Sequence, residues 1–146
     1  MTEPRAAEVV VRRVLDATPD VVFDEWVDAD ALAEWMCPRP ARTTAITLDA
    51  RVGGSFRFDV TDDGTELVIT GRYLELERPR RLQFSWSCTA WSDPSIESVV
   101  TVTLDGYGNG QTLMTITHVL LPPDQAAGHE GGWARIAMQL ADRLPR

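Results

Sequence analysis

The sequence predicts a single α+β domain in which a curved antiparallel β-sheet wraps around a long C-terminal α-helix. Apolar residues alternate with a period of two over most of the chain, and the last segment carries a stripe at helical spacing. Two short helical segments lie between the first strand and the rest. The 146 residues suit one domain, 1–146, and contain no linker and no internal repeat.

The first strand and two short helices are predicted from local signals. Val9 to Leu15 is rich in β-branched residues, which is typical of a strand. Thr18-Pro19-Asp20 indicates a helix start, with Thr18 as the cap and Pro19 at the first helical position. The apolar face of that helix comprises Val22, Phe23, Trp26 and Val27. A second helix is expected from about Asp30 to Met36, ended by Pro38 and Pro40.

Six further strands follow, because the apolar period changes from helical to two. The Asp63-Gly64 pair predicts a hairpin turn, since such turns need positive φ. Gly53-Gly54, Pro79 and the glycine-rich segment 106–110 separate other strands. Consecutive strands with short turns pair antiparallel, and their apolar face has to be buried against a helix. The inward positions are Ile46, Leu48, Phe56, Phe58, Val60, Leu67, Ile69, Gly71, Tyr73, Leu82, Phe84, Trp86, Cys88, Val100, Val102, Leu104, Met114, Ile116 and His118.

The covering helix is expected after Pro122-Pro123. Its stripe consists of Trp133, Ile136, Ala137, Leu140, Ala141 and Leu144. Gly128, Gly131 and Gly132 weaken its first turns, so we expect a bend or a close backbone approach there.

Charge and composition exclude several classes of function. The net charge is −8 and the arginines are scattered, whereas a nucleic-acid binder needs a concentrated basic face. The chain contains no lysine, which excludes Schiff-base chemistry on it. No apolar run approaches the roughly 20 residues of a membrane span, and residues 1–7 lack the core of a signal peptide. We therefore expect a cytoplasmic protein that binds neither nucleic acid nor membrane, with Cys37 and Cys88 reduced.

Several segments together resemble one known superfamily. They are Thr18-Pro19 with Val22-Phe23, residues 32–35 with Pro38, residues 52–58, residues 71–82, residues 115–118 and residues 129–133. In this order and spacing the chain resembles the START-like (SRPBCC, helix-grip) superfamily, which includes the birch-pollen allergens. Within it, the chain is most similar to homologues of the activator of heat-shock protein 90 ATPase. The resemblance implies a seven-stranded sheet gripping the final helix, with an elongated cavity between them.

Inward-facing side chains are the candidates for binding a ligand in that cavity. We expect the site to comprise Trp35, Phe56, Phe58, Ile69, Tyr73, Phe84, Trp86, Met114, Ile116, His118, Trp133 and Ile136. His118 shares the inward face and is either a functional residue, as a polar anchor for a ligand or an acid/base near neutral pH, or a histidine satisfied by a neighbouring hydroxyl or backbone group. His129 is expected to be a solvated residue at the helix start. No metal-ligand spacing occurs, and no cofactor or catalytic residue is indicated.

Three functions remain open from the sequence. The first is binding of a small hydrophobic or aromatic molecule, such as a lipid, polyketide or flavonoid-like compound. The second is an enzyme of the aromatase, cyclase or hydrolase type that uses the same cavity. The third is a co-chaperone-like partner of a heat-shock ATPase, which we rank last because such activators usually carry an additional domain. The sequence also leaves open whether the protein is a homodimer.

Overall fold

The structure is a computed structural model that describes residues 7–145. The elements are β1 (Ala7–Leu15), α1 (Pro19–Trp26), α2 (Ala29–Trp35), β2 (Arg42–Leu48), β3 (Ser55–Asp62), β4 (Thr65–Glu77), β5 (Arg81–Cys88), β6 (Ser98–Tyr107), β7 (Gln111–Leu121), a 3₁₀ turn (Pro123–Gln125) and α3 (Ala126–Arg143). The seven strands form one antiparallel sheet in the order β1-β7-β6-β5-β4-β3-β2. The predicted α+β helix-grip fold is confirmed.

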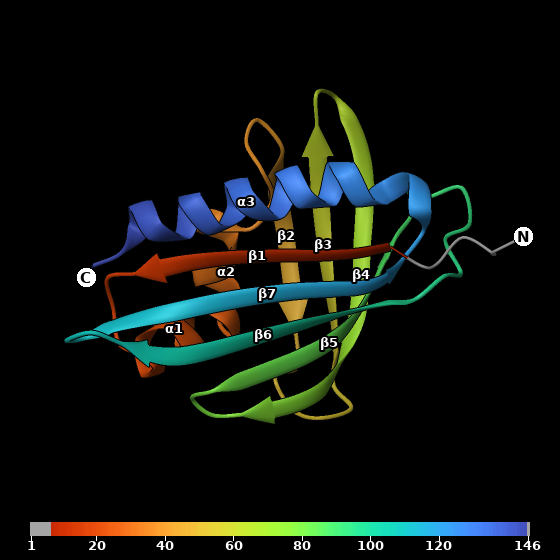
Figure 1. Cartoon of the computed structure of the whole chain (residues 1–146). Helices are drawn as coiled ribbons and strands as arrows, with labels where there is room; N and C mark the ends of the chain where they lie inside the picture. The colour runs from red at the N-terminus through yellow and green to blue at the C-terminus, as the bar shows by residue number, and fades with distance from the viewer. Residues whose placement is uncertain (1–6, 146) are drawn as a thin grey trace, which may run out of the picture.

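The sheet curves strongly, which creates the space that α3 fills. In Figure 1, β1, β7 and β6 run beside α3, whereas β2, β3 and β4 cross at a steep angle behind it. The two short helices lie near the C-terminal end of α3. None of the helices within residues 7–145 is long and apolar enough to span a membrane.

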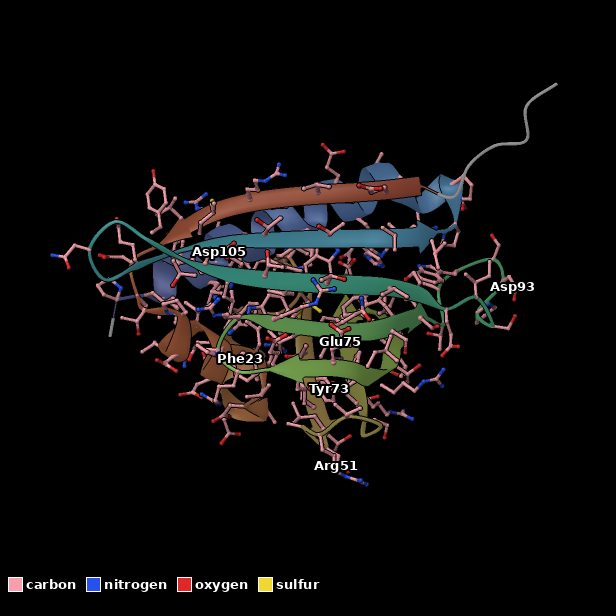
Figure 2. All side chains as sticks on the ribbon, turned by 60° about the horizontal axis from the view of Figure 1, so that its bottom comes forward. Phe23, Arg51, Tyr73, Glu75, Asp93 and Asp105 are labelled. Carbon is pink, nitrogen blue, oxygen red and sulfur yellow. The ribbon has the colours of Figure 1, made fainter. Side chains whose placement is uncertain are left out.

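Local signals placed most strand ends correctly. The β3–β4 hairpin turns at Asp63 and Gly64, whose φ angles are 50° and 78°, so the predicted Asp-Gly turn is confirmed. The glycine-rich segment also turns the chain, with β6 pairing to β7 up to Tyr107 and Gln111. Figure 2 shows Asp93 in the β5–β6 loop at one end of the sheet and Phe23 of α1 toward the other.

Two details of the helices differ from expectation. Thr18 occupies the cap position of α1, but its side chain makes no capping hydrogen bond. The side chain that does cap is Asp28, which accepts from the N–H groups of Asp30 and Ala31 at the start of α2.

The expected close backbone approach at Gly128, Gly131 and Gly132 of α3 was wrong for all three. A Cβ on Gly128 or Gly131 would meet no atom within 4 Å, and one on Gly132 would lie 3.8 Å from Pro38 Cγ, an ordinary contact. α3 runs without interruption from Ala126 to Arg143. These glycines therefore leave space beside the helix.

The close approach lies instead in the sheet, at Gly71. Gly71 pairs with Phe56 across β3 and β4, and the Phe56 ring lies over it. A Cβ on Gly71 would come within 1.9 Å of the Ser85 carbonyl oxygen and 2.4 Å of Phe56 Cζ. The aromatic packing of the interior thus requires glycine at position 71, because a larger residue there would clash with Ser85 and Phe56.

We expect Gly71→Ala to lower the free energy of unfolding by about 1–3 kcal/mol, because the new methyl group overpacks the core. Gly131→Ala is the matched control: it adds the same methyl group on an open helical face and should stabilise by about 0.5–1 kcal/mol. Urea unfolding of the two variants measures both effects. Equal stability of the two would contradict this account of Gly71.

Candidate ligand-binding site

The middle of the expected cavity is filled by aromatic side chains. The Phe56 ring lies 5.0 Å from Phe58, 5.7 Å from Tyr73 and 5.5 Å from Phe84, measured between centroids. The space that remains among these rings is about 10 Å³. That is about the minimum a single water requires, so these four residues form packed core.

A cavity of about 220 Å³ remains at one end of the interior, where α3 begins. We call it the end cavity. It is lined by Met36, Cys37, Pro38, Ile69, Trp86, Gln125, Gly128, His129, Gly132, Trp133 and Ile136. An adjoining cavity of similar volume shares Cys37, Pro38, Ile69, Gln125 and His129 with it and extends to Cys88 and Trp91. The elongated cavity implied by the resemblance is therefore shortened to this end, and the adjoining cavity reaches the β5–β6 loop through Ala90 and Trp91.

The side chain of Gln139, in α3, holds the loop that follows α2, and this loop forms one wall of the end cavity. Its Nε2 donates to the carbonyl oxygens of Trp35 and Cys37, at 2.9 Å each, and its Oε1 accepts from the Arg39 N–H at 2.9 Å. All of these amide contacts join residues about a hundred positions apart in the chain. They hold Cys37 in a left-handed conformation, with φ at 77°.

His118 lies behind the end cavity in a complete chain of hydrogen bonds. Trp133 Nε1 donates to His118 Nδ1 at 3.0 Å. Because an indole N–H only donates, the ring proton of neutral His118 is on Nε2, which lies 2.6 Å from Ser98 Oγ. Ser98 Oγ in turn donates to the Trp86 carbonyl at 2.9 Å.

The same contacts decide between the two interpretations of His118. It is fully buried and both ring nitrogens are occupied, so it is a histidine satisfied by its neighbours. Burial, with a smaller contribution from His129, lowers the pKa of His118 to about 3. It stays neutral at physiological pH and offers no free nitrogen for acid–base chemistry.

His129 is not the solvated residue that the sequence suggested. Its ring is half-buried and lines both cavities, 5.9 Å from the Trp91 ring and 5.3 Å from the His118 ring. Burial lowers its pKa. A signal for this was present, because His129 stands four positions before Trp133 and so extends the apolar face of α3.

The predicted site residues fall into three groups. Ile69, Trp86, Trp133 and Ile136 line the end cavity. Phe56, Phe58, Tyr73 and Phe84 belong to the packed cluster, whereas Trp35, Met114, Ile116 and His118 are buried away from the cavity lining. Sequence reasoning missed Met36, Cys37, Pro38, Gln125, Gly128, His129 and Gly132.

The lining offers little to attract an anion. Among residues 7–145, no arginine lines either cavity, and the one charged side chain in the lining is Asp62 of the adjoining cavity. The start of α3 contributes a positive dipole end worth about 0.3–1 kcal/mol. Removing a carboxylate from water costs several kcal/mol, which exceeds that attraction. Among residues 7–145, no group of three or more His, Cys, Asp or Glu side chains is placed to hold a metal ion.

Comparison with known proteins places this fold in a family. The family model described as "Activator of Hsp90 ATPase homolog 1-like protein" matches residues 16–144. No curated protein matches the chain. A solved protein from Chromobacterium violaceum, CV1439, is 27% identical with a TM-score of 0.81, over 95% of this chain and 96% of that one.

Two other solved structures share the fold at lower identity. The AHSA1 protein SPO3351 from Silicibacter pomeroyi is 22% identical with a TM-score of 0.81, over 94% of this chain and 96% of its own. PFC0360w, described as an HSP90 activator from Plasmodium falciparum, is 23% identical with a TM-score of 0.63, over 79% of this chain and 74% of its own.

We expect His118→Gln to remove part of the acid sensitivity of the fold. The unfolded chain protonates this histidine near pH 6.5, whereas burial lowers its pKa in the folded state to about 3. Its stabilising contribution is therefore present above pH 6.5 and is lost as the pH falls toward 3. Because the unfolded chain takes up this proton and the folded chain does not, the free energy of unfolding falls by about 2 kcal/mol between roughly pH 7.5 and 5.

Urea unfolding at those two pH values measures the effect. His129 titrates in both proteins, so the difference between them isolates His118. The variant should lose about 2 kcal/mol less than the unmodified protein. An equal loss in both would show that His118 is already protonated, or solvated, in the native state.

Proposed function

The chain belongs to the family of Activator of Hsp90 ATPase homolog 1-like proteins, and from this premise we propose that it binds a small hydrophobic or aromatic molecule in the end cavity. The observation that carries the proposal is a cavity with mainly apolar walls at the end of an interior whose middle is packed with aromatic rings. Ligand sites are typically concave, largely apolar and few per protein. Burial of about 200 Å² of apolar ligand surface would contribute about 5 kcal/mol.

The volume of the cavity restricts the ligand. At about 220 Å³ it lies below the range of roughly 300–1,000 Å³ that is common for drug-sized ligands. The adjoining cavity extends the available space toward Cys88 and Trp91, whereas the packed aromatic cluster closes it toward the middle of the interior. A compact aromatic compound therefore fits this proposal better than a long acyl chain does.

The enzymatic alternative has less support. His118, the residue on which it depended, has no free nitrogen. The co-chaperone alternative is favoured by one observation, the description of a solved relative as an HSP90 activator. It would use the outer surface, so association with a heat-shock ATPase should be insensitive to changes inside the end cavity.

We expect Gly132→Leu to abolish ligand binding while Gly131→Leu leaves it intact. Gly132 lines the end cavity beside Pro38, so a leucine there fills the gap between α3 and the loop after α2. Gly131, its neighbour in α3, lines neither cavity and faces open space. Both changes replace one helical glycine by the same residue, which matches their effect on helix propensity.

Native mass spectrometry of protein purified from its source or expression host supplies the readout. The unmodified protein and Gly131→Leu should carry a discrete added mass that is lost on denaturation, and Gly132→Leu should not. The same added mass on all three proteins would place the ligand elsewhere. A clean apo mass, with no thermal shift against a panel of lipophilic compounds, would overturn the proposal in favour of a protein partner.

A further inference from the structure

The polar side chains that line the end cavity include those of Gln125 and His129, and His129 has one ring nitrogen without a partner in the described residues. Its Nδ1 lies 2.9 Å from the carbonyl oxygen of Gln125. A carbonyl oxygen only accepts, so Nδ1 carries the ring proton and Nε2 of the neutral ring presents a lone pair. Within residues 7–145, Nε2 makes no hydrogen bond. The ring thus brings an unused acceptor into an apolar site.

The protonation state of His129 is set by its surroundings. Burial beside Trp91 and His118 lowers its pKa, so the ring is neutral at pH 7. The hydrogen bond to the Gln125 carbonyl acts in the opposite direction and raises the pKa of His129, but burial is the larger effect. In the described part of the chain, the titratable and charged groups that line the two cavities with it are Cys37, Cys88 and Asp62, none of which is a cation. His129 is therefore an acceptor of hydrogen bonds and not a site for anions.

The complementary ligand group is therefore a donor. Within residues 7–145 the cavity wall also includes Trp86, whose indole N–H has no partner but is itself enclosed by protein, so this ring contributes apolar surface to the site. A hydroxyl group is the simplest neutral ligand group that donates a hydrogen bond to such an acceptor.

We propose that the end cavity selects neutral aromatic or alicyclic compounds that carry a hydroxyl group, and that the ligand O–H donates to His129 Nε2. This inference rests on the proposed function, because it specifies which ligand the cavity takes. It excludes carboxylates such as fatty acids, which would have to give up their hydration in a site whose lining, within residues 7–145, has no cationic side chain.

Three bicyclic probes separate these possibilities: naphthalene, 2-naphthol and 2-naphthoate. They share one ring system and differ in a hydrogen, a hydroxyl or a carboxylate. Isothermal titration at neutral pH should show 2-naphthol binding about 5- to 10-fold more tightly than naphthalene, the gain of one net hydrogen bond. 2-Naphthoate should bind more weakly than either.

The His129→Leu variant tests the assignment of the acceptor. Leucine keeps an apolar side chain at the site and removes the lone pair, so the ratio of naphthol to naphthalene affinity should fall to about one. His129→Gln restores an acceptor oxygen and should recover part of that ratio. Because the readout is a ratio of two affinities, a general loosening of the cavity does not imitate the result.

The outcomes distinguish the two proposals. If the unmodified protein binds naphthalene and 2-naphthol equally, or the ratio is unchanged in His129→Leu, this inference is wrong while ligand binding in the end cavity stands. Tightest binding of 2-naphthoate would also overturn it. If none of the probes binds, both proposals fail.

Discussion

The hydrogen-bond chain from Trp133 through His118 and Ser98 to the Trp86 carbonyl joins α3 to β7, β6 and β5. Each donor in it has one acceptor, and the direction is fixed at its start by an indole that only donates. The chain also orients the Trp133 ring, whose centroid lies 5.2 Å from that of Trp86; both rings line the end cavity. Breaking it would leave polar atoms buried without partners, at about 1–3 kcal/mol each. The grip of the sheet on the helix and the shape of the site therefore depend on the same contacts.

The position of the cavity follows from the sizes of the side chains along the concave face. Toward α1 and α2 the interior is filled by large rings, such as Trp26 and Trp35, whose centroids lie 4.8 Å apart. Where α3 begins, the lining changes to small residues, including Gly128, Gly132 and Cys37. A strongly curved sheet needs bulky side chains to fill the space against one helix. The cavity lies where this sequence provides glycine and cysteine instead.

The fold was predictable because its determinants are local. Period-two alternation, the Asp63-Gly64 turn and the stripe of α3 each occupy a short window of sequence, and all agree with one architecture. The site was predictable only in part. Ile69, Trp86, Trp133 and Ile136 follow from facing inward, but which inward residues border empty space depends on the packing of all the others.

The members of the site that were missed share a physical reason. Cys37 and Pro38 lie in a loop whose position is set by Gln139, about a hundred residues away, and no local pattern reports such a contact. A residue other than glycine at a φ of 77° is strained by about 1–3 kcal/mol. The three hydrogen bonds of Gln139 offset that strain at about 0.5–1.5 kcal/mol each. Because α3 holds the loop in this way, the cavity wall is fixed without a ligand, and a ligand of the proposed kind would bind at a lower ordering cost. Under that proposal the wall would select by its fixed shape and by the free acceptor of His129.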